Sequence, residues 1–368
     1  MKPTFALYTD MIMNQTEMFH IMKATIEASM HHREANVLVH TQMVLEQYNN
    51  ITPDKWTLSN LEGAFACLFH DVGKPQAEVN KHSEERGDYH SYPGHEIISA
   101  RMWENWIVDN YTAVHNLFPE FGIRSIYNVG WMIEHHLPYG ITNSYKKLCI
   151  YKTGRSMLGN TFTDVLIADA NGRINDNKEA HELRQNIWLD AYNEYENVDS
   201  AACFDKHLYV LIGASGTGKS TIVESIVSNS PEGDVQIFSL DDCRLNWYSD
   251  DSIIDSVEQY EQCYHKAVAD PEFIRKAQHG YTTIVKRKTS IVVVDGTNLS
   301  AKRRRFYLDL AKANKRTTHA IYVTSSLSVI AEHQDARHDK YISADVSTNQ
   351  YNKTQYPSYH EFDDIIVL

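Results

Sequence analysis

The sequence predicts a protein of two domains that differ in fold class. An all-α helical bundle is expected at the N-terminus, because the segments that carry most of the histidines have the character of helices. An α/β domain with a parallel sheet is expected at the C-terminus, because apolar strands alternate there with amphipathic helices. The 368 residues suffice for two ordinary domains, which we place at residues 1–200 and 201–368.

Composition and charge limit the class of protein. Hydrophobic residues make up 42% of the chain and charged residues 23%, and no apolar run approaches the roughly 20 residues that span a bilayer. The N-terminus has no extended apolar signal core, and the five scattered cysteines contain no C-x-x-C pair, so we expect reduced thiols, a cytoplasmic protein and no membrane partner. A net charge of −13 argues against a surface that coats nucleic acid, but not against a local basic groove.

The clearest basic cluster lies near the start of a helix in the C-terminal half. It comprises Lys302, Arg303, Arg304, Arg305, Lys312, Lys315 and Arg316. A solvated helix face is the favoured interpretation, and a nucleic-acid groove is the alternative.

A complete phosphate-binding loop, G-x-x-x-x-G-K-[ST], occupies residues 213–220. A buried strand is predicted before it and a helix after it, so backbone N–H groups and the helix dipole converge on phosphate oxygens. Lys219 is expected to reach the β- and γ-phosphates, and the Ser220 hydroxyl to bind Mg²⁺. We therefore predict that ATP or another nucleoside triphosphate binds with Mg²⁺ to Gly213, Ser215, Gly216, Thr217, Gly218, Lys219, Ser220 and Thr221.

The predicted strands are 207–213, 235–240, 291–295, 318–323 and 365–367. Asp241 and Arg244 follow the second strand, at the edge where open α/β sheets bind ligands. A carboxylate there can accept the proton of an attacking hydroxyl, and an arginine can hold a phosphate with two hydrogen bonds. The alternative is an aspartate that caps a helix, followed by a surface arginine.

Two further segments extend this pattern. Asp295 ends the third strand, as the acidic residue of a Walker B motif does, although helix-initiating turns look the same. Residues 332–337 resemble a helical lid whose Arg337 could cover the phosphates, and the tail from Pro357 to Asp363 precedes the last strand.

Taken together, these motifs in residues 205–368 resemble the phage polynucleotide 5′-kinase family. The resemblance implies that Asp241 is the general base, that Arg244 contacts the acceptor phosphate and that Asp295 helps to hold the acceptor nucleotide. It also implies that Arg337 clamps the γ-phosphate. The chain has Gln334 where the family often has asparagine.

The N-terminal half contains an adjacent His70-Asp71 pair at the end of the apolar stretch 64–69. Gly73 and Pro75 follow as helix stop signals, and an imidazole beside a carboxylate can chelate a divalent cation. Further candidate ligands on probable helices are His40, His95, His135, His136 and Asp169. Each of these alone would be an ordinary surface or core residue, and they converge only if the helices pack as a bundle around an internal site.

This ordered series resembles the HD phosphohydrolase superfamily. The resemblance implies that His40, His70, Asp71 and Asp169 are metal ligands, and that His95 and His135 serve a second ion. His136 is not separable from His135 in the sequence. Asp164 competes with Asp169, which we prefer because A-D-x-x-G-R has the family spacing.

Lys74 and Arg173 are then candidates for binding a phosphate oxygen. The implied cofactor is one or two ions of Mn²⁺, Ni²⁺, Co²⁺ or Mg²⁺, and the implied reaction is phosphoester hydrolysis. An acidic helical linker is expected over residues 174–205.

The order of the two domains resembles bifunctional enzymes that heal broken nucleic-acid ends. This implies removal of a 2′,3′-cyclic, 2′- or 3′-terminal phosphate by the first domain and phosphorylation of a 5′-OH end by the second. The expected partners are RNA or DNA ends and a separate ligase. Two alternatives remain: an HD nucleotidase fused to a nucleoside or other small-molecule kinase, and a regulatory HD module that senses a nucleotide.

Overall fold

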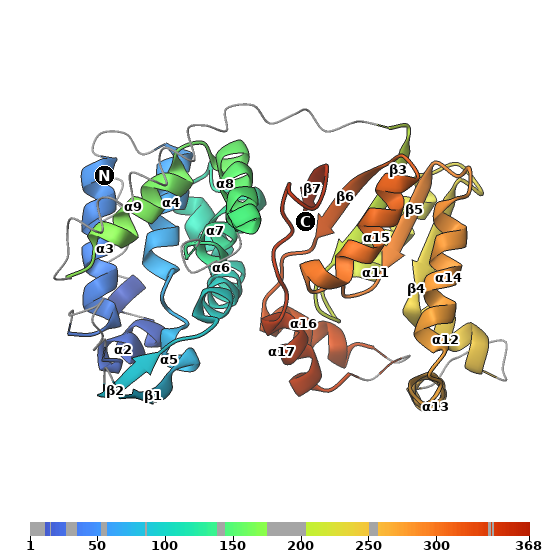
Figure 1. The fold of residues 1–368 in the computed structure, drawn as a ribbon, viewed down its shortest axis with the longest axis horizontal. Helices are drawn as coiled ribbons and strands as arrows, with labels where there is room; N and C mark the ends of the chain where they lie inside the picture. The colour runs from blue at the N-terminus through green and yellow to red at the C-terminus, as the bar shows by residue number, and fades with distance from the viewer. Residues whose placement is uncertain are drawn as a thin grey trace. The chain divides into compact units, whose positions relative to one another are not determined.

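The computed structural model describes residues 12–14, 16–26, 35–52, 57–84, 87–137, 144–174, 204–249, 257–337, 340 and 342–368. The chain divides into two compact units, Met1–Asp199 and Ser200–Leu368 (Figure 1). Residues 175–203 of the predicted acidic linker lie outside the described residues. None of the helices in the described ranges has the length and apolar composition that crossing a membrane requires.

The first unit is mainly helical. Its helices are α2 (Glu17–Ala24), α3 (Val37–Ile51), α4 (Leu58–Phe69), α5 (Lys74–Ala77), α6 (His95–Leu117), α7 (Ile123–Glu134), α8 (Ser144–Leu158) and α9 (Thr161–Asn171). Every residue of α4 from Leu61 to Phe69 is buried, and α3, α7 and α9 pack around this helix. A helix that is buried all round belongs at the centre of a core, so the residues that follow Phe69 emerge inside the unit.

A close approach fixes the turn after α4. A Cβ atom on Gly73 would lie 2.6 Å from the Ser99 backbone nitrogen and 2.7 Å from the His95 carbonyl oxygen. The Gly73 N–H donates to the Ser99 hydroxyl at 2.9 Å. Only glycine therefore fits at this position, and the turn carrying His70 and Asp71 lies directly against the first turns of α6.

The first unit also contains one element that the sequence did not predict. Strands β1 (Val79–Ser83) and β2 (Gly87–Ser91) form an antiparallel hairpin, with Val79 paired to Ser91. Nearly all side chains of β1 are exposed, so its sequence lacks the apolar alternation that marks a half-buried strand. The expectation of an all-α domain was wrong to this extent.

The second unit is an α/β domain with a five-stranded parallel sheet in the order β4-β5-β3-β6-β7. The strands are β3 (Lys206–Ile212), β4 (Val235–Ser239), β5 (Ile291–Asp295), β6 (Arg316–Tyr322) and β7 (Asp364–Val367), which confirms each predicted strand within two residues. The helices are α11 (Lys219–Ser228), α12 (Leu240–Tyr248), α13 (Val257–Ala269), α14 (Phe273–Val285), α15 (Ala301–Ala313), α16 (Leu327–Asp335) and α17 (Ala344–Asn352).

The parallel strands of this unit pack against α11 and end at a common edge of the sheet. Leu211, Val293 and Ile321 from three neighbouring strands pack with Val223 of α11. Since all strands are parallel and β3 lies at the centre, the carboxyl ends of β3, β4 and β5 share one edge of the sheet (Figure 1). The phosphate-binding loop, α12 and Asp295 begin at that edge.

The basic cluster is not a uniformly solvated face. Arg304 and Arg316 are fully buried. Arg304 donates from Nε and Nη2 to both carboxylate oxygens of Glu361, at 2.8 and 2.7 Å. Arg316 donates to backbone carbonyls, including that of Val285 at 2.9 Å.

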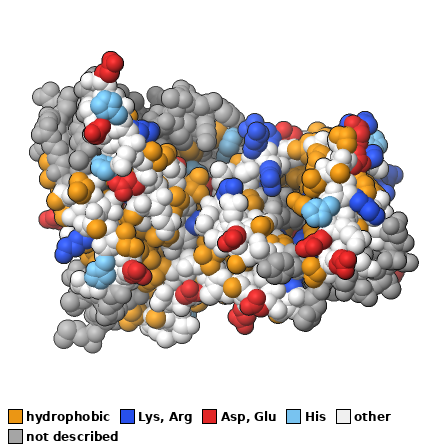
Figure 2. Space-filling view, turned by 90° about the horizontal axis from the view of Figure 1, so that it is seen from below, with side chains coloured by type: hydrophobic (Ala, Val, Ile, Leu, Met, Phe, Trp, Pro, Cys, Tyr) orange, Lys and Arg blue, Asp and Glu red, His pale blue; other side chains and the backbone are white. Residues whose placement is uncertain are grey.

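Arg304 connects α15 to the C-terminal segment that contains Glu361, and Arg316 connects β6 to the end of α14. Both arginines therefore have structural roles. On the face drawn in Figure 2, charged side chains of both signs are interspersed.

Replacing Arg304 by alanine should destabilise the second unit by about 3 kcal/mol, because loss of one partner of a buried ion pair leaves the other uncompensated. Arg305→Ala is the matched control, since Arg305 is exposed on the same helix. Urea unfolding measures both. Equal stability of the two variants would contradict the structural role of Arg304.

Candidate active sites

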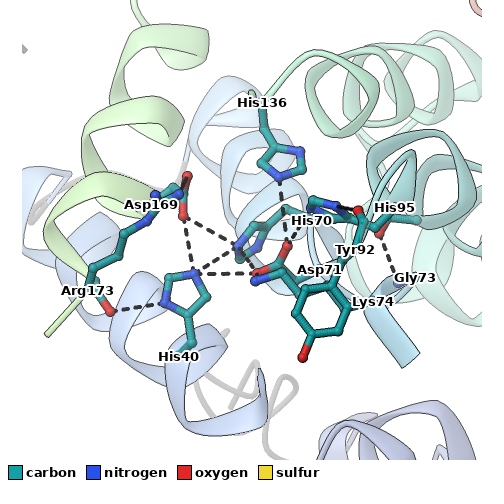
Figure 3. Close-up of polar contacts among 12 residues, drawn as sticks. His40, His70, Asp71, Gly73, Lys74, Tyr92, His95, His136, Asp169 and Arg173 are labelled. Carbon is teal, nitrogen blue, oxygen red and sulfur yellow. Dashed lines mark hydrogen bonds and ion pairs between the residues drawn. The ribbon is translucent and has the colours of Figure 1, made fainter. Parts of the chain in front are cut away.

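Histidine and aspartate side chains from five helical segments of the first unit converge at one buried place (Figure 3). In chain order they are His40, His70, Asp71, His95, His136 and Asp169. They come from α3, the turn after α4, the start of α6, the end of α7, and α9. Packing of the helices around α4 thus brings together residues that are far apart in the sequence.

Asp71 lies at the centre of this cluster. Its Oδ2 atom lies 3.1 Å from Nε2 of His70 and 3.4 Å from Nε2 of His40. Its Oδ1 atom lies 3.1 Å from Nε2 of His95 and 3.7 Å from Nε2 of His136. One carboxylate therefore faces two pairs of imidazoles.

Asp169 joins the first of these pairs, with its Oδ1 atom 3.2 Å from Nε2 of His40. Two groups of candidate ligands result, His40/His70/Asp71 and Asp71/His95/His136, and within each the ligand atoms lie within 4.8 Å of one another. Donors bound to one ion at about 2.1 Å are about 3 to 4 Å apart. The spacing in both groups therefore suits a divalent cation.

The tautomers of the four histidines follow from their outer contacts. Each Nδ1 lies within hydrogen-bond distance of a backbone carbonyl: His40 with Gly172 at 3.1 Å, and His70 with Cys67, His95 with Tyr92 and His136 with Ile133 at 2.7 Å. A carbonyl only accepts, so each Nδ1 must donate, and a neutral ring then presents a lone pair at Nε2. Histidines that ligate metals are usually oriented in this way.

The electrostatics of the cluster favour an ionised Asp71. Burial alone would raise the pKa of the Asp71 carboxyl, but His70 and Lys74 outweigh it and hold that pKa well below its usual range. Burial, with the nearby His70 and His95, lowers the pKa of His136 to about 3. The centre therefore combines an ionised carboxylate with a neutral imidazole.

Lys74 and Arg173 lie at the margin of the cluster. The Lys74 ammonium group is 2.8 Å from Oδ2 of Asp71 and lies over the Tyr92 ring. Arg173 Nη2 donates to Oδ2 of Asp169 at 2.6 Å. Burial alone would raise the pKa of Asp169, but Arg173, His40 and His70 together outweigh it and hold that pKa well below its usual range.

The alternatives left open by the sequence differ in position. His136 lies in the cluster, whereas the ring of His135 stacks on Trp131 at 4.3 Å and its Nδ1 bonds to the Trp131 carbonyl oxygen at 2.9 Å. Asp164 is in neither group of candidate ligands among the described residues, and burial raises its pKa to about 6. Of the two neighbouring histidines that the sequence could not separate, the structure brings His136 into the cluster and leaves His135 outside it.

In the second unit, residues 213–218 connect β3 to α11 as predicted. Gly216 and Gly218 have φ angles of +92° and +90°, which a residue with a side chain rarely adopts. Ser220 and Thr221 lie in the first turn of α11 with exposed side chains. The loop thus has the local geometry that phosphate binding requires.

Lys219 is buried and folds back on the loop, where its ammonium group contacts the Ala214 carbonyl oxygen and lies 3.3 Å from the Thr217 hydroxyl. Burial lowers the pKa of Lys219 to about 8, although the charge of Asp295 opposes this shift. The charges of Lys340 and Arg337 add to the lowering.

Asp241 and Arg244 occupy successive turns of α12 and form an ion pair. Asp241 also pairs with Lys340 and accepts a hydrogen bond from the Tyr260 hydroxyl at 2.9 Å. Burial alone would raise the pKa of Asp241, but Lys340 and Arg244 outweigh it and lower that pKa. Asp295 has the opposite shift, because burial raises its pKa more than Lys219 lowers it.

Sequence reasoning missed several residues of this site. Tyr260 and Lys340 contact Asp241, and no motif marks either of them. Gln350 of α17 accepts the Ser215 N–H at 2.9 Å, and Nδ1 of His333 in α16 donates to the Gly216 carbonyl oxygen at 2.7 Å. The C-terminal helices thus hold the loop through contacts that sequence spacing does not reveal.

The position of His136 leads to a prediction about metal binding. His136→Gln should weaken Mn²⁺ binding at least about tenfold, since even the outer partners of metal ligands contribute this much. His135→Gln removes a neighbouring imidazole that lies outside the cluster and should bind Mn²⁺ as the unchanged protein does. Isothermal titration calorimetry measures both. A larger loss in the His135 variant would contradict the placement.

Comparison with known proteins concerns the second unit. Residues 208–356 match the family model AAA_33, described as an AAA domain. No match is found among the curated proteins.

Among solved structures, a gluconokinase from Sinorhizobium meliloti 1021 is similar at 16% identity, covering 45% of this chain and 83% of its own, with a TM-score of 0.31. Kti12 from Chaetomium thermophilum in complex with ADP-AlF3 is similar at 17% identity, covering 44% of this chain and 88% of its own, with a TM-score of 0.30. The loop, the sheet and the family match together make the second unit an α/β domain of the P-loop type.

Proposed function

We propose that the second unit transfers the γ-phosphoryl group of ATP to the 5′-OH end of a polynucleotide. The observation that carries this proposal is the Asp241–Arg244 pair at the sheet edge that also holds the phosphate-binding loop. Such a pair supplies a base for a hydroxyl and a cation for the phosphate that follows it in the chain. A kinase whose small-molecule acceptor carries no anionic group needs the base but not the second group.

Each residue has a task in this reaction. The loop amides and Lys219 hold the β- and γ-phosphates, and Ser220 binds the Mg²⁺ that accompanies ATP. The lowered pKa of Asp241 keeps its carboxyl group ionised, as a proton acceptor must be. Asp241 then takes the proton of the attacking 5′-OH.

Three further groups position the reactants. Tyr260 and Lys340 orient the Asp241 carboxylate. Arg337 balances charge on the transferred phosphoryl group, and Asp295 helps to hold the acceptor nucleotide.

We propose that the first unit is an HD-type domain and a metal-dependent phosphoesterase. The donor set fits one or two divalent cations, because buried carboxylates and imidazoles with protonated Nδ1 atoms all direct their acceptor atoms to one place. His40, His70, Asp71 and Asp169 would hold one ion, and Asp71, His95 and His136 a second. A bound Mn²⁺, Ni²⁺, Co²⁺ or Mg²⁺ ion would offset charge on a phosphate and make water a better nucleophile at neutral pH.

The chain's own cations complete this site. Lys74 and Arg173 lie at its margin, each against one of the two aspartates. They can therefore bind the oxygens of a terminal phosphate and fix its orientation toward the centre. The substrates we propose are 2′,3′-cyclic, 2′- and 3′-terminal phosphates.

The two activities together would convert broken RNA or DNA ends into ends that a separate ligase can join. We place the protein in the cytoplasm. A competition assay separates this function from that of a small-molecule kinase: with ATP and Mg²⁺, a 5′-OH oligonucleotide should be phosphorylated in preference to free nucleosides. Preference for the nucleoside would overturn the proposal.

Asp241→Asn should lower 5′-phosphorylation about 10²- to 10⁴-fold with little change in ATP binding, because a base is lost and no nucleotide contact is lost. Asp242→Asn is the matched control, since it removes the adjacent carboxylate, which is exposed. Rates of ³²P transfer and the Kd for ATP measure the two effects. Near-normal transfer by the Asp241 variant would contradict the assignment of the base.

Replacing both His70 and Asp71 by alanine should abolish hydrolysis of terminal phosphates and leave 5′-phosphorylation intact, because the two units are compact and have separate sites. Product analysis of both ends of one RNA gives the two readouts. A folded double variant that has lost kinase activity would show instead that the two reactions share a site.

A further inference from the structure

Two aromatic side chains beside Arg244 are unusually exposed. The Trp247 side chain is 43% exposed and that of Tyr264 is 42% exposed. Single exposed apolar residues are ordinary on a protein surface, but Tyr264 contacts the Arg244 guanidinium directly and Trp247 is linked to it through Phe273. They also belong to different helices, α12 and α13.

A connected set of rings links them to Arg244. The Arg244 guanidinium carbon lies 5.3 Å from the centre of the Tyr264 ring and 5.5 Å from that of Phe273. Phe273 in turn packs edge-on against Trp247, with ring centres 5.7 Å apart. The buried Phe273 side chain therefore supports one side of Trp247 while the indole stays open to solvent.

Helix α12 aligns this set with the proposed acceptor site. Asp241, Arg244 and Trp247 are spaced three residues apart and so lie along one row of the helix. No residue of α12, all of which the structure describes, is buried. The row therefore runs from the proposed base, through the partly exposed Arg244, to the exposed indole of Trp247.

Part of the hydrogen-bonding capacity of the guanidinium group is unused among the described residues. Nη1 of Arg244 pairs with Asp241, but its buried Nε atom has no hydrogen-bond partner among the described residues. Lys340 supplies a second cation nearby, with its ammonium group 4.5 Å from the centre of the Tyr260 ring. Cations next to exposed aromatic rings suit a single-stranded nucleic acid, in which phosphates alternate with flat bases.

We propose that Trp247 and Tyr264 form a stacking platform for the bases at the 5′ end of a single-stranded polynucleotide acceptor. This inference rests on the proposed kinase function and adds its substrate class. With the first phosphate at Arg244, the neighbouring bases stack on the exposed rings. A single strand is required because paired bases are already stacked within a duplex.

The test compares Trp247→Ala and Tyr264→Ala with Val268→Ala, which removes a non-aromatic exposed side chain of α13. Each aromatic variant should raise the KM for a 5′-OH oligonucleotide about tenfold or more, as loss of one stacked base does. The KM for ATP should not change, which also shows that the variant is folded. Trp247→Phe should recover part of the affinity.

A second measurement needs no turnover. Adding the oligonucleotide without ATP should quench tryptophan fluorescence in the unchanged protein, and the Trp247→Phe protein should lose most of that quenching. If the unchanged protein phosphorylates no oligonucleotide, the proposed kinase function itself fails.

If the unchanged protein phosphorylates the oligonucleotide and the aromatic variants keep its KM for that oligonucleotide, only the platform is refuted. An equal rise in the oligonucleotide KM of the Val268 variant would also overturn the platform.

Discussion

A carboxylate remains ionised inside a protein only if surrounding groups balance its charge, and the first unit is arranged around this constraint at Asp71. The side chain is buried at the end of the central helix α4, between two pairs of imidazoles and the Lys74 ammonium group. Each imidazole is held from behind by a backbone carbonyl. The ring nitrogens that face Asp71 therefore carry lone pairs, and a cation between them would relieve the repulsion.

The second unit meets the same constraint at the edge of a sheet. Lys219 and Asp295 are both largely removed from water, and each shifts the pKa of the other toward the charged form. Asp241 is balanced by Arg244 and Lys340. Anionic phosphates and Mg²⁺ would complete this set of charges, in agreement with the ligand site that we propose at this edge.

The sequence predicted those parts of the molecule that local patterns determine. The phosphate-binding loop, the five strands and the position of Asp241 after β4 follow from spacing and apolar runs. The hairpin β1–β2 did not, because its strands are short, polar and exposed.

Contacts between residues far apart in the chain could not be predicted from the sequence either. Burial of Arg304 depends on Glu361, 57 residues later, and the contact of Lys340 with Asp241 spans 99 residues. His135 and His136 are identical in type and adjacent, so only the direction of the chain after α7 separates them.

The most direct test of the account uses one RNA with a 5′-OH at one end and a 2′,3′-cyclic phosphate at the other. The protein is incubated with this RNA, ATP and Mg²⁺ or Mn²⁺, and both ends are identified by mass spectrometry. The account predicts a 5′-phosphate together with free 2′- and 3′-hydroxyls. An RNA recovered with both ends unchanged, under conditions in which the protein binds ATP and metal, would contradict it.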